Sequence, residues 1–159
     1  NEENLIIPDN IRAISACVFY ECNTLKSVKL PDGISEIFAG TFYSCTNLET
    51  VIMPDSLIKI RLSAFEKCTS LKNVIFGRNL RNIHGAAFAG CTSLKELTIP
   101  DTVRVIEQHA FANCTSLEKV TLSENTFISR RIFYGCEKIH IYSSQTGNEI
   151  TDWYNGITY

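Results

Sequence analysis

The stretch at residues 68–74, CTSLKNV, decides the fold because close copies of it return along the chain. The copies CNTLKSV, CTNLETV, CTSLKEL and CTSLEKV begin at Cys22, Cys45, Cys91 and Cys114. With Cys136, the six cysteines are separated by 23, 23, 23, 23 and 22 residues, and Cys17 alone lies outside the series. A fixed period of this length indicates a repeat protein built from stacked supersecondary units.

Other residues keep the same period. Three residues before each cysteine stands a phenylalanine: Phe19, Phe42, Phe65, Phe88, Phe111 and Phe133. Apolar residues follow Cys22, Cys45, Cys68 and Cys91 by 3, 6, 8, 12 and 15 positions, as in Leu71, Val74, Phe76, Leu80 and Ile83. A unit this short cannot bury its own apolar face, whereas stacked units align equivalent residues into ladders. We therefore predict a mainly β solenoid of about six 23-residue coils, the first of them truncated.

Within each coil the pattern separates strand from turn. Val28 and Leu30 are two residues apart, as on one face of a strand, and Pro31 after them has no N–H with which to continue a ladder. The segments SAFEKC, AAFAGC and HAFANC are short and rich in alanine. We predict that these segments form single turns of α- or 3₁₀-helix.

The seven cysteines allow two interpretations. Equivalent residues on neighbouring strands lie close enough for a disulfide, about 4.8 Å apart. Their Cβ vectors would run parallel, however, and disulfide geometry disfavours that arrangement. Free thiols that fill small inward sites are the favoured interpretation, because an unpaired cysteine behaves as a small hydrophobe. Cys17, outside the ladder, is expected to be semi-exposed.

The C-terminal segment SSQTGNEITDWYNGITY breaks the repeat. Thr146 and Glu149 have capping-box spacing, and Ile150, Trp153 and Tyr154 would share one face of a short helix. We predict repeats over 1–142 and a C-terminal cap with this helix over 143–159. The alternative is that the two aromatic residues form a ligand platform.

The combination of the LPD, I-x-x-I and AF-x-x-C motifs resembles the BspA-like, or Treponema-type, class of leucine-rich repeats over residues 5 to about 142. The resemblance implies a curved solenoid with parallel strands on its concave side. It also implies adhesion or recognition on bacterial or protist surfaces, with host matrix proteins as partners. Asparagine follows the strand only at Asn79 and Asn125, so the usual asparagine ladder is expected to be missing.

The rest of the composition favours binding over catalysis. A net charge of −2 indicates no overall attraction to nucleic acid, and no apolar run is long enough to span a membrane. His84, His109 and His140 stand at different repeat positions and are expected to be solvated, without a metal. No nucleophile motif or Gly-rich phosphate loop occurs, so we predict no enzyme activity and no cofactor.

The outward strand positions are the candidate partner-binding site. They lie five and seven residues after each cysteine: Ser27, Lys29, Thr50, Ile52, Asn73, Ile75, Glu96, Thr98, Lys119 and Thr121. Ile52 and Ile75 would form a small apolar patch among polar groups, and such patches often mark contacts. The alternative is that β-branched residues here simply favour strand pairing.

Three functions fit this pattern. The first is a protein-binding adhesion module of a secreted or cell-surface protein, although the sequence begins NEENLIIPDN and contains no leader. The second is an intracellular scaffold, because free thiols suit a reducing compartment. The third is an accessory domain of a larger enzyme. An uncapped N-terminal edge would also permit dimerisation.

Overall fold

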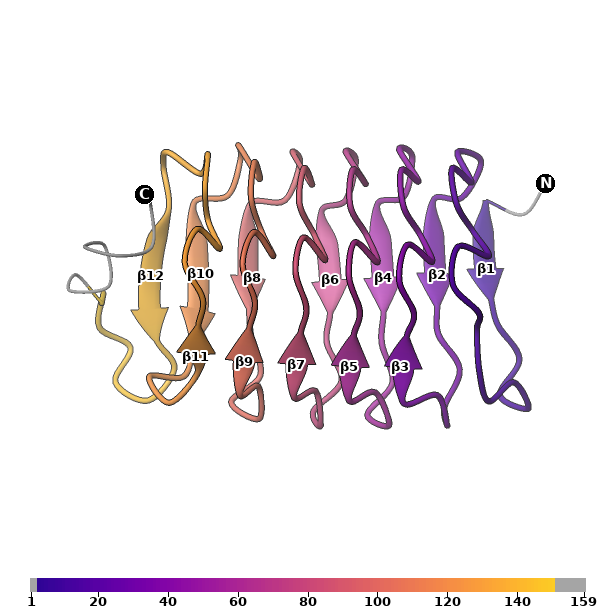
Figure 1. Ribbon diagram of the computed structural model, residues 1–159, viewed down its shortest axis with the longest axis horizontal. Coiled ribbons are helices and arrows are strands. Elements are labelled where there is room, and N and C mark those ends of the chain that lie inside the picture. Colours follow the sequence, from indigo (N-terminus) through magenta and orange to yellow (C-terminus); the bar gives the residue numbers. More distant parts are fainter. Residues whose placement is uncertain (1–2, 151–159) are drawn as a thin grey trace.

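The computed structural model describes residues 3–150, which form coils stacked along one axis (Figure 1). Each coil from β2 to β11 contributes one longer and one shorter strand, the first and last coils contribute only β1 and β12, and the strands of neighbouring coils are parallel. The elements are β1 (Asn4–Ile6), β2 (Ser27–Lys29), β3 (Glu36–Ile37), β4 (Thr50–Ile52), β5 (Lys59–Ile60), β6 (Asn73–Ile75), β7 (Asn82–Ile83), β8 (Glu96–Thr98), β9 (Val105–Ile106), β10 (Lys119–Leu122), β11 (Phe127–Ile128) and β12 (His140–Ser143).

The strands line two sides of the solenoid. The longer strands β1, β2, β4, β6, β8, β10 and β12 form the side predicted to be concave, which we call the sheet face. The shorter strands form one continuous five-stranded sheet in the order β11-β9-β7-β5-β3 on the opposite side. Pairing advances by one repeat, with Ser27 opposite Thr50 and Thr50 opposite Asn73. The predicted solenoid of parallel strands is confirmed.

The sheet face is interrupted once. Its strands form a four-stranded sheet β1-β2-β4-β6 and a three-stranded sheet β12-β10-β8, and β6 is not paired with β8. Figure 1 shows a wider space between these two strands than between their neighbours. On the opposite side, β7 still pairs with β9. The solenoid is therefore opened on one side only.

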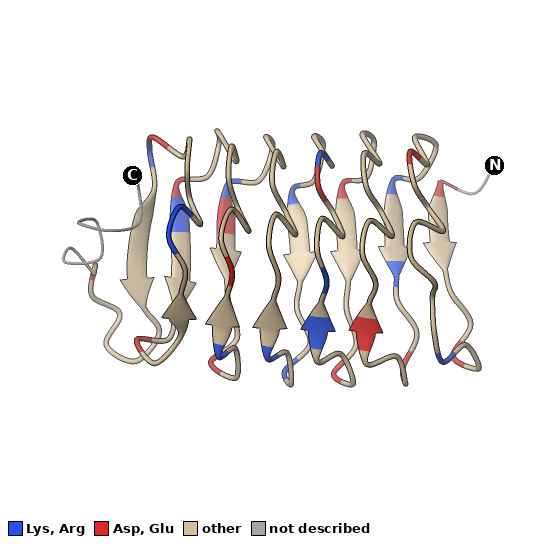
Figure 2. Ribbon diagram, in the orientation of Figure 1, with Lys and Arg blue, Asp and Glu red and all other residues tan. Residues whose placement is uncertain are grey.

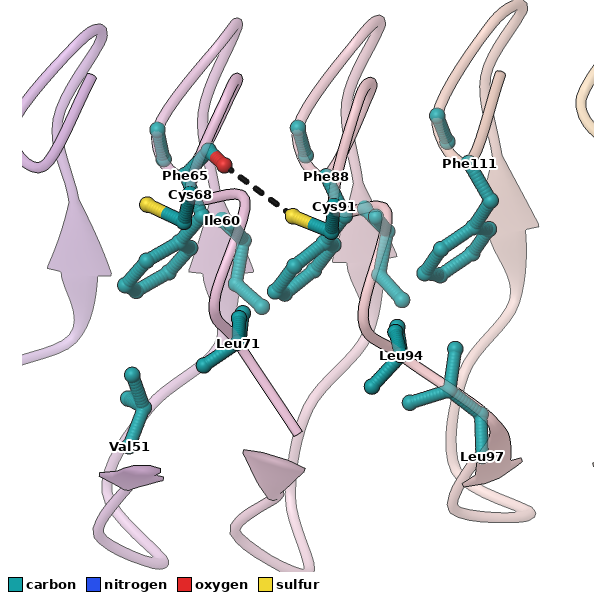
Figure 3. Close-up of a cluster of buried hydrophobic side chains, with 14 of the residues drawn as sticks. Val51, Ile60, Phe65, Cys68, Leu71, Phe88, Cys91, Leu94, Leu97 and Phe111 are labelled. Atoms are coloured by element: carbon teal, nitrogen blue, oxygen red, sulfur yellow. Dashed lines mark hydrogen bonds between the residues drawn. The ribbon is translucent and has the colours of Figure 1, made fainter. Parts of the chain in front are cut away.

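The core consists of the predicted ladders. Phe42, Phe65, Phe88 and Phe111 are completely buried, and their rings stack in sequence with centroids 5.1 to 5.4 Å apart. Aliphatic residues surround this stack, and Figure 3 shows Leu71 and Leu94 in equivalent places on neighbouring coils. Near-parallel rings at this spacing exclude water and add an aromatic contact to the burial of each side chain.

The cysteine ladder supplies hydrogen bonds as well as volume. Each buried thiol donates to the backbone carbonyl of the phenylalanine in the preceding coil, as Cys91 does to Phe65 at 3.3 Å (Figure 3). The equivalent bonds of Cys45, Cys68 and Cys114 are 3.0, 3.1 and 3.2 Å long. Seven cysteines are free, Cys17 is exposed and Cys22 is partly buried. The prediction of unpaired core thiols is confirmed.

The predicted helical turns are wrong, and none of residues 3–150 is helical. Two positions in each of these segments have positive φ, as at Ser63 (54°) and Lys67 (61°). Alternate N–H groups point to the next coil: Ser63, Phe65 and Lys67 donate to Gly85, Ala87 and Ala89. A helix would turn those donors along its own axis. Hydrogen bonding between coils therefore outweighs the local preference of alanine for helix.

Polar side chains tie the corners of neighbouring coils together in place of a uniform asparagine ladder. The Ser56 hydroxyl donates to the carbonyl of Ile34, and Thr102 donates to the carbonyl of Leu80, both at 2.8 Å. Asn79 donates through its amide to the carbonyl of Asp55. Serine, asparagine and threonine, at equivalent places in their coils, thus each satisfy a corner carbonyl of the preceding coil.

The described part of the C-terminal segment folds back as an extended chain. Residues 144–146 form a turn, and Glu149 makes an antiparallel bridge to Tyr142. Ile150 donates its N–H to Ile141, so no helix begins at Thr146. The other residues of the expected helix, from 151 on, lie outside the described range, and the boundary at 142 and the cap remain predictions. The dimer through the edge of β1 also remains a prediction.

A charged cluster bridges three positions on the side of the shorter strands. Glu36 contacts Arg61 at 2.8 Å and Lys59 at 3.4 Å, with its side chain only 20% exposed. The hydrogen bond from Arg61, with a second contact from Lys59, lowers the pKa of Glu36 below its ordinary value of 4.5. A carboxylate held this way contributes to stability only while it is ionised.

We expect Phe65→Ala to lower the free energy of unfolding by about 3–5 kcal/mol, because it removes a fully buried ring and leaves a cavity. Urea denaturation followed by circular dichroism measures the loss. Phe127→Ala is the control, because that ring is 66% exposed and its loss should cost less than about 0.5 kcal/mol. Equal losses in the two variants would contradict the stacked core.

We expect a thiol reagent such as DTNB to label Cys17 rapidly in the native protein and Cys22 more slowly. The remaining five thiols are buried out of reach of the reagent, and burial also raises the pKa of Cys91, which disfavours its reactive thiolate. All seven should react in denaturant. Rapid native labelling of most of the thiols would show that the ladder is not a packed core.

We expect the free energy of unfolding to fall on acidification partly through Glu36. Because the pKa of Glu36 is lower in the folded state, its contribution is complete above about pH 4.5 and is lost as pH falls through the folded value. Glu36→Gln should flatten this decline, with an effect of up to about 1 kcal/mol. Urea melts at several pH values test this, with the exposed Glu137→Gln as control; equal profiles for wild type and Glu36→Gln would refute it.

Candidate functional site

The sheet face presents its side chains in two outward rows. In each longer strand the second residue points into the core, as Val28, Val51 and Val120 do, and the residues on either side of it point outward. All ten residues predicted for the binding site occupy these outward positions and are exposed or partly buried. The structure therefore brings them onto one surface, and their role in binding stays a prediction.

Neighbouring strands are linked along the rows by their side chains. Ser27 donates to the side-chain oxygen of Asn4 at 2.6 Å, and Asn73 donates to the Thr50 hydroxyl at 3.3 Å. The Lys119 ammonium lies 5.4 Å from the centre of the Tyr142 ring. These links fix the outward side chains against the sheet and lower the entropy that they would lose on binding.

An apolar strip runs through the second row. Ile52 and Ile75 lie directly opposite each other in the strand pairing, with 37% and 53% of their surfaces exposed. Ile6 is 72% exposed in the same row, separated from Ile52 by Lys29. The sequence pattern had identified two of these three isoleucines and missed Ile6, because the first coil has no cysteine to mark its register.

Charges alternate at the start of the longer strands until the interruption. Lys26 pairs with Glu3 at 2.9 Å and Lys72 pairs with Glu49 at 3.0 Å. The next residue in this row is Lys95, so two lysines face each other across the space between β6 and β8. Elsewhere, acidic and basic residues are interspersed along the coils (Figure 2).

A cavity of about 970 Å³ lies at the interruption. Its lining comes from both sides of the space between the strands: Thr50, Lys72, Asn73, Val74, Ile75, Ser93, Lys95, Glu96, Leu97, Thr98 and Ser116. Five of the ten predicted site residues line it: Thr50, Asn73, Ile75, Glu96 and Thr98. The cavity was not predicted from the sequence. Its signal was present at Phe76 and Gly77, where this coil departs from the aliphatic residue and proline of its neighbours.

Outside the sheet face, the described residues contain no chemically convergent site. Residues 3–150 hold no group of three or more His, Cys, Asp or Glu side chains placed to bind a metal. His84 is partly buried rather than solvated, and its Nδ1 lies 3.0 Å from Glu107. The buried thiols contact carbonyls and no base. The described part of the chain also has no helix with the length and apolarity needed to cross a membrane.

Comparison with known proteins agrees with this architecture. The family model of the BspA type leucine rich repeat region matches in six copies, over residues 1–118 and 81–154. No curated protein sequence matches the chain significantly.

Solved structures give the same result. A leucine-rich repeat protein of T. pallidum is 30% identical, with a TM-score of 0.81 over 89% of this chain and 70% of its own. A leucine-rich repeat protein of Bacteroides ovatus is 32% identical, with a TM-score of 0.78 over 87% of this chain and 39% of its own. A leucine rich cell surface protein of Faecalibacterium prausnitzii is 25% identical, with a TM-score of 0.74 over 98% of this chain and 50% of its own.

The family match extends over most of the sequence, and the coils, strand register and core ladders are those that its repeat pattern requires. The chain belongs to the BspA-type leucine-rich repeat family.

Proposed function

We propose that this chain is a non-catalytic protein-binding module that recognises its partner through the sheet face. The observation that carries the proposal is the rigid double row of outward side chains, in which an exposed apolar strip is bordered by polar and charged groups. Leucine-rich repeat proteins are generally protein-interaction modules, and a face of this composition suits contact with another protein.

Affinity on such a surface depends on a few anchors rather than on its total area. Ile52 and Ile75 are the apolar anchors at the centre of the described face, and the polar row beside them supplies hydrogen bonds.

We propose further that the parent protein is secreted or displayed at the cell surface and binds host or matrix proteins. The cell surface protein of Faecalibacterium prausnitzii, similar along nearly the whole chain, supports this location.

An intracellular scaffold is the second candidate, and one observation favours it. All seven cysteines are free, and five are buried as thiols, a state that a reducing compartment preserves. The same sheet face would then bind an intracellular protein. A role as an accessory domain of a larger enzyme has no specific support among the described residues.

We expect immobilised fibronectin or fibrinogen to bind the chain in a surface plasmon resonance panel of matrix proteins. The double variant Ile52→Asp, Ile75→Asp should weaken this binding at least tenfold, because it places two charges at the apolar centre of the interface. Unchanged melting temperature would show that the fold is intact.

Leu62→Asp is the matched control. Leu62 is 57% exposed and lies outside the sheet face, so its substitution should leave binding unchanged. Loss of binding in this control alone would move the interface away from the sheet face. No binding of any matrix protein would favour the scaffold over the adhesion module.

A further inference from the structure

The interruption between β6 and β8 leaves main-chain groups without the partners that their equivalents have. The N–H groups of Lys72 and Asn73 both donate to the carbonyl of Glu49 in the preceding coil. The equivalent N–H groups of Lys95 and Glu96 make no such bond within the described chain, although those of Glu118 and Lys119 again bond to Lys95. The edges of β6 and β8 that face each other are thus open.

Phe76 gives the interruption a physical cause. Its place in the coil holds Leu30, Met53, Ile99 or Leu122 in the other units. The larger Phe76 ring packs edge-on against Phe88 of the next coil, with centroids 6.0 Å apart, and it remains only partly buried. An aromatic ring in place of an aliphatic side chain therefore wedges β8 away from β6.

Contacts at the corner that follows Phe76 hold the coil of β6 close to the preceding coil. A Cβ on Gly77 would lie 1.9 Å from the carbonyl oxygen of Pro54, so only glycine permits this approach. Arg78 then contacts Asp55 through two nitrogens, at 2.6 and 2.8 Å. On the far side of the gap, the side chain of Asp101 contacts Ser144 toward the C-terminal end. Thr102 still bonds to the carbonyl of Arg78, so the corner stays closed while the strands part.

We propose that the space between β6 and β8 is a slot that takes an extended segment of a partner protein as an added strand. This inference rests on the proposed protein-binding function and specifies how part of the sheet face performs it. A strand in the slot would pair its main chain with both open edges, so that affinity comes from backbone hydrogen bonds. The cavity of about 970 Å³ between the edges provides the room.

The lining specifies the chemistry of the segment. Lys72 and Lys95 flank the start of the slot, and Lys95 has no ion pair within the described chain, so an acidic residue is favoured there. The residue of the bound segment two positions after this acidic residue would lie between Val74 and Leu97, whose side chains point inward. An apolar side chain is therefore favoured at that position of the segment. The intervening residue faces solvent beside Asn73 and Glu96. The expected motif is an acidic residue, a polar residue and a β-branched apolar residue.

The chain itself contains a segment of this kind, which supplies a probe. Residues 116–123, SLEKVTLS, contain strand β10 (Lys119–Leu122), with Glu118 directly before it at the acidic position and Val120 at the inward one. A fluorescently labelled synthetic peptide of this sequence should bind the protein saturably in fluorescence anisotropy. Peptides with Glu118→Lys, or with methylated backbone nitrogens at Lys119 and Thr121, should bind at least tenfold more weakly.

Protein variants test the same slot from the other side. Phe76→Leu should let β8 pair with β6 and abolish peptide binding, and hydrogen exchange at Lys95 and Glu96 should slow at least tenfold toward that of Lys72 and Asn73. Lys95→Glu should restore binding of the Glu118→Lys peptide. Absence of peptide binding up to millimolar concentration, or equal binding by Phe76→Leu or by the methylated peptide, would overturn the slot.

These outcomes separate the slot from the general proposal. Phe76→Leu leaves the outward side chains of the sheet face in place. Matrix-protein binding that survives Phe76→Leu but is lost in Ile52→Asp, Ile75→Asp would retain the sheet face as an interface and reject the slot as the binding site for matrix proteins. Peptide binding without matrix-protein binding would retain the slot and reject the matrix ligand.

Discussion

The structure depends on one constraint: each coil must place the same residue types where its neighbours place theirs. A single coil has no interior of its own, so its apolar side chains are buried mainly against the equivalent residues of adjacent coils. The stacked phenylalanines and the thiols that donate to phenylalanine carbonyls both express this rule. Cysteine meets two demands here, because it is small enough for the inward site and can still donate to the coil before it.

The same constraint explains why one departure from the pattern has a large local effect. Phe76 is apolar and helps to form the core, yet it is larger than the aliphatic residues at the equivalent positions, and the strand before it does not pair with β8. The remaining ladders, including Phe65 with Phe88 and β7 with β9, hold the coils together around the gap. Stability is therefore distributed over several ladders, and the sheet face can open at one point without separating the coils.

This distribution leaves the outward side chains free for recognition. The inward residues are required by the stacking, whereas Ile52, Ile75 and Thr98 are exposed and can vary without loss of the core. Main-chain edges are normally hidden inside a solenoid, and in our proposal the internal gap adds a second means of recognition to the side chains of the face. In the proposed slot, side chains select the segment and the backbone holds it.

The sequence by itself determined the period, the inward ladders, the parallel strands and the outward positions, because each follows from one residue type repeated at a fixed interval. It did not identify Ile6 as an outward residue, because the first coil lacks its cysteine. It also did not predict the helix-free turns, because hydrogen bonds between coils outweigh the local preference of alanine for helix. Only the tertiary structure decided where the sheet face opens. Three features meet there: the size of Phe76, the close approach of Gly77 to Pro54 and the corner contacts of Arg78. Their combined effect cannot be predicted from any one position of the repeat pattern.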